Sequence, residues 1–480
     1  MKNRSDSAPA LPHPGPLPLA EGEAIAASLR THRDGIGIAA CREIRAGRQP
    51  HPFTAGESRG EGECTNHRPG AWSLSRDRSL SVALFTAFVL SVASGSSSFA
   101  GDWPVFRGPN RTGVIEAKDW QEWPASGPKI AWRGKVGLGF SSVVIAKGRA
   151  ATVGHASNKD TVFCFDAVTG KELWKHSYPA QLGNVFYEGG TTGTPTFEGD
   201  RLYWLSRWGD LFCFDATSGK IVWSKNIHKE TGVKLPTWGF TGAPLVHENL
   251  LVLNVGEAGL AVDKTNGKIV WQSANGDAGY STPLAVQRAG QWLALMGNSE
   301  NYLAVNLQTG KEAWRHKWLT EYGVNAADPI VSGDRVFIAS GYGKGGALLD
   351  LGSGQPKELW KTKALRTQFN SAVLHDGHLY GPDGDTTEKA SLKCIEFATG
   401  AVKWTHPGFG SGGLLIADGK IVALSGTGEL LVAPATPAAF KPTSRAQVIG
   451  GKCWTAPSMA NGIIYCRSGR GDVVAVDVRK

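Results

Sequence analysis

The sequence predicts an all-β protein, and three observations point to this class. Seven tryptophans recur 42 to 49 residues apart, at positions 132, 174, 223, 271, 314, 360 and 404. Four of them close one phrase, as in Phe-Asp-Ala-Thr-Ser-Gly-Lys-Ile-Val-Trp at 214–223. Between the phrases lie short apolar runs bounded by Gly, Asn and Asp, without a sustained helical period. One supersecondary unit is therefore repeated along the chain.

Each unit is expected to contain four short strands. In one unit we expect strands at 195–198, 201–206, 211–215 and 220–225, because turn residues separate these apolar runs. Gly219 can adopt positive φ in the last turn, and the carboxylate of Asp215 can cap that turn. The tryptophan that follows lies on the outer strand and is expected to fill the gap between neighbouring units. Four strands in each of many such units indicate a β-propeller.

Eight blades are expected within residues 101–480, and seven is the alternative. The chain ends in a third strand, 473–478, with no fourth strand after it. The segment 129–134, which includes Trp132, is therefore expected to supply that strand, so that the ring closes without a free sheet edge. The unit after Trp404 is degenerate: its third strand is 429–433, and Val448 stands 44 residues after that tryptophan. Seven blades would follow if this unit were only a long connection.

The first hundred residues are expected to lie outside the propeller. Residues 1–75 are proline-rich in part, carry no clear period and are interpreted as a disordered or wrongly included leader. Residues 76–100 combine a basic flank, a short apolar run and small residues at Ser98 and Ala100, which is typical of a secretory signal. We therefore expect an exported protein, periplasmic or extracellular, that begins at Gly101 and spans no membrane after cleavage. A start codon near Leu74 would explain the preceding segment.

Charge and cysteine usage exclude several functions. Residues 101–480 carry 40 Lys and Arg against 33 Asp and Glu, with no basic run, so nucleic-acid binding is not expected. Cys164, Cys213 and Cys394 each stand ten residues before a tryptophan and are expected to pack in the core. A disulfide between Cys453 and Cys466 would need a bulge and is not favoured. Neither a haem-attachment motif nor zinc spacing occurs.

The repeated phrase resembles the tryptophan-docking repeat of pyrroloquinoline quinone dehydrogenases, which the propeller lipoprotein of outer-membrane barrel assembly shares. The segments 102–113, 322–329 and 450–455 are similar to exported quinoprotein-like propellers labelled polyvinyl-alcohol-dehydrogenase-like or barrel-assembly-like. The resemblance covers about 101–480 and implies an eight-bladed ring. For the dehydrogenases it also implies pyrroloquinoline quinone, calcium held by acidic and amide side chains, and an aspartate base. Those enzymes usually carry adjacent cysteines over the cofactor, and this chain has none.

Candidate site residues lie in the loops expected to surround the central funnel. Asn325 and Asp328 are the best pair of calcium-like oxygen ligands, and the competing interpretation is that Asp328 caps the turn before Pro329. Trp238 and Trp454 either stack on a flat or sugar ligand or fill the funnel. Arg366 and Lys452 could bind an anionic group, and Asn370 is a further polar candidate for cofactor binding.

Two functions follow from these expectations. The first is an exported, monomeric, non-catalytic propeller that binds a protein, peptide or polymer on its funnel face. The alternative is a pyrroloquinoline quinone-dependent dehydrogenase of alcohols or sugars that needs calcium. The fold alone does not choose between them. The missing cysteine pair and the modest length favour the binding protein.

Overall fold

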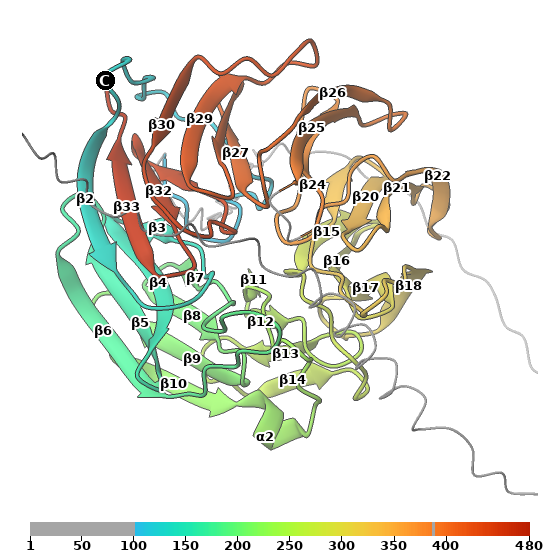
Figure 1. Cartoon of the computed structure of the whole chain (residues 1–480). Helices are drawn as coiled ribbons and strands as arrows, with labels where there is room; N and C mark the ends of the chain where they lie inside the picture. The colour runs from blue at the N-terminus through green and yellow to red at the C-terminus, as the bar shows by residue number, and fades with distance from the viewer. Residues whose placement is uncertain (1–100, 386–388) are drawn as a thin grey trace, which may run out of the picture. The chain divides into compact units, whose positions relative to one another are not determined.

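The computed structural model describes residues 101–385 and 389–480, and within them eight antiparallel sheets form the blades of a β-propeller (Figure 1). The leader at 1–75 and the signal at 76–100 lie outside the described residues. The first four blades, each from its innermost to its outermost strand, are β3 (Val144–Ala146), β4 (Arg149–Ala156), β5 (Lys159–Asp166), β6 (Glu172–Pro179); β7 (Thr196–Glu198), β8 (Arg201–Leu205), β9 (Asp210–Asp215), β10 (Ile221–Asn226); β11 (Leu245–His247), β12 (Leu250–Leu253), β13 (Leu260–Asp263), β14 (Ile269–Gln272); and β15 (Leu284–Arg288), β16 (Gln291–Gly297), β17 (Asn301–Asn306), β18 (Glu312–Lys317).

The remaining four blades follow the same order. They are β19 (Ile330–Ser332), β20 (Arg335–Ser340), β21 (Gly345–Asp350), β22 (Lys357–Thr362); β23 (Val373–His375), β24 (His378–Asp383), β25 (Ser391–Glu396), β26 (Val402–His406); β27 (Gly413–Ala417), β28 (Lys420–Leu424), β29 (Glu429–Pro434), β30 (Ser444–Gln447); and β31 (Ser458–Ala460), β32 (Ile463–Arg467), β33 (Asp472–Asp477), β2 (Lys129–Lys135). One short helix, α2 (Ile227–Thr231), follows β10, and β1 (Val114–Ile115) adds to β27. No helix in the described part of the chain is long and apolar enough to cross a membrane.

The ring closes where the sequence predicted. Strand β2 pairs antiparallel with β33, with Lys129 opposite Asp477 and Trp132 opposite Ala475, and Figure 1 shows the two strands side by side. The eighth blade is thus built from both ends of the described chain. The strands of blade 2 also begin and end within one residue of the predicted bounds. The seven-blade alternative is wrong, because β27 to β30 form a complete blade of their own.

The repeated tryptophan docks most blades onto the next. The indole Nε1 of Trp174 donates to the carbonyl oxygen of Ala216 in blade 2 at 3.0 Å. A Cβ on Gly219 would lie 2.5 Å from the same indole, so only glycine, here at φ 71°, lets the turn pack flat on the ring. Asp215 caps that turn as predicted, accepting from the amide and hydroxyl of Ser218. Other junctions repeat the indole-to-carbonyl bond.

The junction between blades 7 and 8 uses a different tryptophan. Strand register places Ser444, rather than Val448, at the docking position, because Ser444 pairs with Val432 as Trp404 pairs with Cys394. The Ser444 hydroxyl donates to the carbonyl oxygen of Trp123 at 3.1 Å, and Trp123 is 8% exposed. A residue from before the first blade therefore fills the gap that the degenerate repeat leaves.

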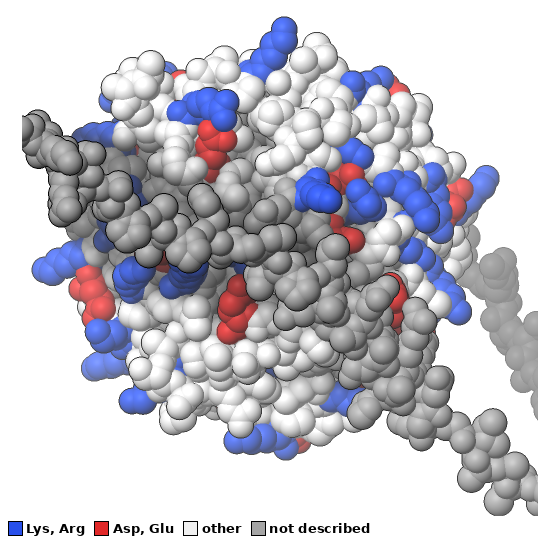
Figure 2. Space-filling view, viewed as in Figure 1, with Lys and Arg blue, Asp and Glu red and all other residues white. Residues whose placement is uncertain are grey.

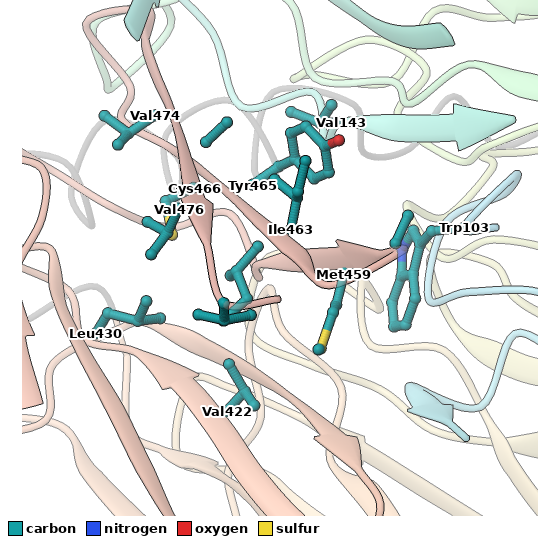
Figure 3. Packing of buried hydrophobic residues seen from close by; sticks show 14 of the residues in the cluster. Trp103, Val143, Val422, Leu430, Met459, Ile463, Tyr465, Cys466, Val474 and Val476 are labelled. Carbon is teal, nitrogen blue, oxygen red and sulfur yellow. The ribbon is translucent and has the colours of Figure 1, made fainter. Parts of the chain in front are cut away.

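The hydrophobic core is divided into layers between blades. Most layers join apolar side chains of two neighbouring sheets. The largest joins three, those of blades 7, 8 and 1 (Figure 3). Cys164, Cys213 and Cys394 lie in these layers opposite tryptophans, as predicted for packing residues. Cys453 and Cys466 are buried free thiols.

Candidate functional site

The segment that precedes the blades enters the axis of the ring. Residues 101–113, named here the axial segment, bond to the first strands of six blades or to residues next to them in the chain. The contacts are Trp103 with Ile145, Pro104 with Phe197, Arg111 with Pro244, Arg107 with Ala372, Gly113 with Ile416 and Gly101 with Asn461. Figure 3 shows Trp103 beside the core layer of blades 7, 8 and 1. The axial segment therefore occupies the channel of the propeller.

The axial cavity beside this segment is small. Its volume is about 20 Å³, and Trp103, Arg107, Ser142, Asn370, Ser371 and Ser458 contribute to its wall. Such a volume holds about one water molecule. A drug-sized ligand needs several hundred Å³. The cavity therefore does not fit a tricyclic quinone.

The predicted calcium-like pair is engaged in protein contacts. Asn325 is fully buried; its amide nitrogen donates to Asn298 and Trp318 carbonyls at 2.8 and 3.0 Å, and its oxygen accepts from Ser340 at 2.7 Å. Asp328 accepts from the amide of Thr282 at 2.7 Å. The two side chains thus hold neighbouring loops together.

Two cations also act on the carboxylate of Asp328. Burial raises its pKa, and the charges of Arg107 and Arg111 lower it. A calcium ion there would face two guanidinium groups and would compete with the amide of Thr282. The pair therefore does not fit a calcium site. No cluster of three or more His, Cys, Asp or Glu suited to a metal occurs in residues 101–385 and 389–480.

Arg366 and Asn370 also have protein partners. Arg366 forms a bidentate pair with Asp383, with Nε to Oδ1 at 2.9 Å and Nη2 to Oδ2 at 3.1 Å. Lys393 binds the same carboxylate at 2.6 Å. Burial would raise the pKa of Asp383, but hydrogen bonds from Arg366 and Lys393 hold it below its usual range. Asn370 donates to the carbonyl oxygen of Trp454 at 2.8 Å and to that of Gly412 at 3.0 Å. These two candidates thus brace loops of the funnel face.

The predicted tryptophans belong to a larger aromatic surface. The loops from each fourth strand to the next first strand, together with those from second to third strands, lie at one end of the ring, the funnel face, because successive strands are antiparallel. Seven aromatic side chains in these loops form one chain of ring contacts and sequence neighbours, the aromatic rim: Phe369, Trp454, Phe140, Tyr187, Phe186, Trp238 and Tyr280.

All seven rim residues are partly or fully exposed, and Phe186 is 51% exposed. Trp454 lies between Phe140 at 5.2 Å and Phe369 at 4.9 Å, and Trp238 lies 5.7 Å from Tyr280 between ring centroids. Partly exposed aromatic rings that contact one another form an apolar surface suited to binding. Sequence reasoning found Trp238 and Trp454. It missed most of the rim, because the rings come from six loops distant in sequence.

Basic side chains accompany the rim. The Lys452 ammonium lies 4.3 Å from the centroid of the Trp454 ring and 2.5 Å from Glu188. Arg207, 2% exposed, donates to the Tyr187 hydroxyl at 2.7 Å and to the Trp238 carbonyl oxygen at 3.0 Å. Arg207 therefore positions two stretches of the rim. In the view of Figure 2, blue and red side chains are interspersed between larger white areas.

Comparisons with known proteins agree with this architecture. BamB from Moraxella catarrhalis superposes with a TM-score of 0.56 at 17% identity, over 73% of this chain and 100% of that one. Quinohemoprotein alcohol dehydrogenase from Comamonas testosteroni superposes with a TM-score of 0.60 at 15% identity, over 79% of this chain and 81% of that one. A europium-containing methanol dehydrogenase superposes with a TM-score of 0.60 at 13% identity, over 78% of this chain and 89% of that one. These likenesses show the fold alone.

Sequence comparison is more specific. A search of curated proteins finds no match. Residues 158–406, slightly more than half of the chain, match the family model described as outer membrane protein assembly factor BamB. The quinoprotein-like resemblance of the repeats is thus confirmed at the level of family and fold, and the chain belongs to this BamB family.

Proposed function

We propose that this protein is an exported, non-catalytic propeller that binds an extended polypeptide on the aromatic rim. The observation that carries the proposal is the rim itself: seven contacting aromatic side chains, none of them buried, along six loops of one face. Aromatic groups are the side chains that most often dominate binding energy at protein interfaces. The matched family is described by its role in outer membrane protein assembly, which supports a protein ligand and a periplasmic location.

The axis below the rim supports binding rather than turnover. The axial segment fills the channel, and the cavity beside it has room for about one water molecule. The oxygens of Asn325 and Asp328 already accept hydrogen bonds from Ser340 and Thr282. A ligand on the funnel face would therefore lie over a closed floor and contact the loops by stacking and hydrogen bonding.

A binding measurement tests the proposal. Residues 101–480 are titrated into fluorescently labelled unfolded polypeptides of outer-membrane type, and anisotropy gives Kd. Substituting Trp238→Ala or Trp454→Ala should raise Kd about thirtyfold, the equivalent of about 2 kcal/mol for a central aromatic contact. Trp292→Ala is the matched control, because Trp292 is 39% exposed at the opposite end of blade 4. Equal Kd values for all variants would refute the assignment to the rim.

Two further measurements address other ligands. Binding of polysaccharides with the same sensitivity to Trp454→Ala, and none of polypeptides, would replace the proposed ligand class. Added pyrroloquinoline quinone and Ca²⁺ should neither raise Tm nor support dye-linked oxidation of alcohols or sugars. Turnover in that assay would overturn the non-catalytic proposal in favour of the dehydrogenase.

A further inference from the structure

Two arginines of the axial segment carry more positive charge into the ring than the surrounding carboxylates balance. Arg107 is 9% exposed, and its Nη2 donates to the carbonyl oxygen of Ala372 at 2.7 Å. Arg111 donates to the carbonyl oxygen of Pro244 at 2.9 Å. Among described residues, the carboxylate whose charge acts on both is Asp328. Two guanidinium groups and one carboxylate leave one positive charge without a partner.

The Arg107 guanidinium is buried, whereas Arg111 is only partly buried, so a counterion is most favourable beside Arg107. Burial lowers the pKa of Arg111 to about 10 and lowers that of Arg107, while Asp328 acts in the opposite direction. Taking an unpaired charge out of water is costly unless an opposite charge accompanies it. Burial also disfavours the charged form of Asp328, so this carboxylate offsets only part of the cost.

The wall of the axial cavity beside Arg107 includes two hydrogen-bond donors that can face a ligand. The Nε of Arg107 is buried and has no hydrogen-bond partner. The hydroxyl of Ser371, also in the wall, accepts from the amide of Asp328 at 2.7 Å, so its own proton is not used in that bond. The hydroxyl of Ser458 donates to the carbonyl oxygen of Val143 at 2.6 Å, and the amide of Asn370 donates to main-chain carbonyls. The available groups are thus a cation and a hydroxyl proton.

We propose that the axial cavity binds one small monovalent anion of the halide class, held by the guanidinium of Arg107 and the hydroxyl of Ser371. A cavity of about 20 Å³ accepts a monatomic anion and is too small for a carboxylate or phosphate ligand. The anion neutralises the excess charge and accepts from the two donors. It thereby links the axial segment to the residues just before the first strand of blade 6.

Crystals grown in sodium bromide test the site directly. Anomalous scattering should place one bromide beside Arg107 and Ser371. In solution, Tm should rise saturably when chloride replaces gluconate at constant ionic strength, by about 3 °C at a hundred times Kd for a protein of this size. Gluconate is too large for the cavity, so it serves as the reference anion.

Variants separate binding from general salt effects. Ser371→Ala and Arg107→Gln should each reduce the chloride-dependent rise at least threefold. Arg445→Gln, which removes a surface arginine paired with Glu429, should leave it unchanged. If Arg107→Gln does not fold, Ser371→Ala and the bromide crystals still decide. A missing bromide peak, or a peak with no halide-specific rise in Tm, would overturn the proposal, the latter because it would indicate binding at crystal concentration only.

Discussion

Removing one docking tryptophan should destabilise the whole ring. Trp174 is 8% exposed, its indole donates to Ala216 in the next blade, and Gly219 packs on its face. Replacing a buried tryptophan by alanine costs about 3–5 kcal/mol, through the lost apolar contact and the cavity left behind. The carbonyl oxygen of Ala216 also loses its partner. We therefore expect Trp174→Ala to lower the free energy of unfolding by about 4 kcal/mol.

The size of the protein converts this loss into a temperature. The unfolding entropy of about 2.1 cal/mol/K per residue gives about 0.8 kcal/mol/K for residues 101–480. Trp174→Ala should thus lower Tm by about 5 °C, measured by calorimetry at one scan rate. Leu173→Ala is the control, because Leu173 lies on the same strand as Trp174 but is 43% exposed; it should lower Tm by about 1 °C. Equal shifts for the two variants would refute the docking argument.

Three further predictions concern the ring and its charges. Trp123→Ala should lower Tm by about as much as Trp174→Ala, because Trp123 fills the junction of blades 7 and 8; a shift below about 1 °C in calorimetry would contradict this. Asp383→Asn should cost about 3 kcal/mol at pH 7 in urea unfolding, since it breaks a buried ion pair. The pKa of Asp383 is lowered in the folded state, so its contribution to stability is present above pH about 4 and is lost as pH falls through the folded pKa. The free energy of unfolding of the variant should therefore fall less steeply than that of the wild type as the pH is lowered below about 4. The same steepness in both proteins would count against the ion pair. Burial raises the pKa of the Cys164 thiol to about 12, so native protein should react with a thiol reagent only after denaturation, and rapid native labelling would contradict the burial.

The repeat made most of the ring predictable from sequence. The phrase ending in Trp223 carries its own turn, cap and docking group, so local residues determine the blade and its contact with the next. The seam at Lys129 was also predictable, because a third strand at the end of the chain lacked its neighbour. The first case depends only on residues within one repeat, and the second on the fourth strand that the last repeat lacks.

The axis and the site were less predictable. Arg107 bonds to Ala372, 265 residues away, and Ser444 bonds to Trp123, 321 residues away. Nothing in the local sequence indicates such partners. The polar candidates in the loops were interpreted as ligand-binding groups, yet Asn325 satisfies neighbouring carbonyls instead. Buried loop backbone needs donors of this kind, and sequence alone does not separate them from ligand contacts.

Site-specific photo-crosslinking tests the central proposal most directly. A benzoylphenylalanine replaces Phe186, which is 51% exposed on the aromatic rim, or Leu173, which is 43% exposed on the outer strand of blade 1. Each protein is irradiated with a labelled unfolded polypeptide. The proposal predicts strong crosslinking from position 186 and little from position 173. Equal crosslinking from both positions, or crosslinking from 173 alone, would contradict binding at the rim.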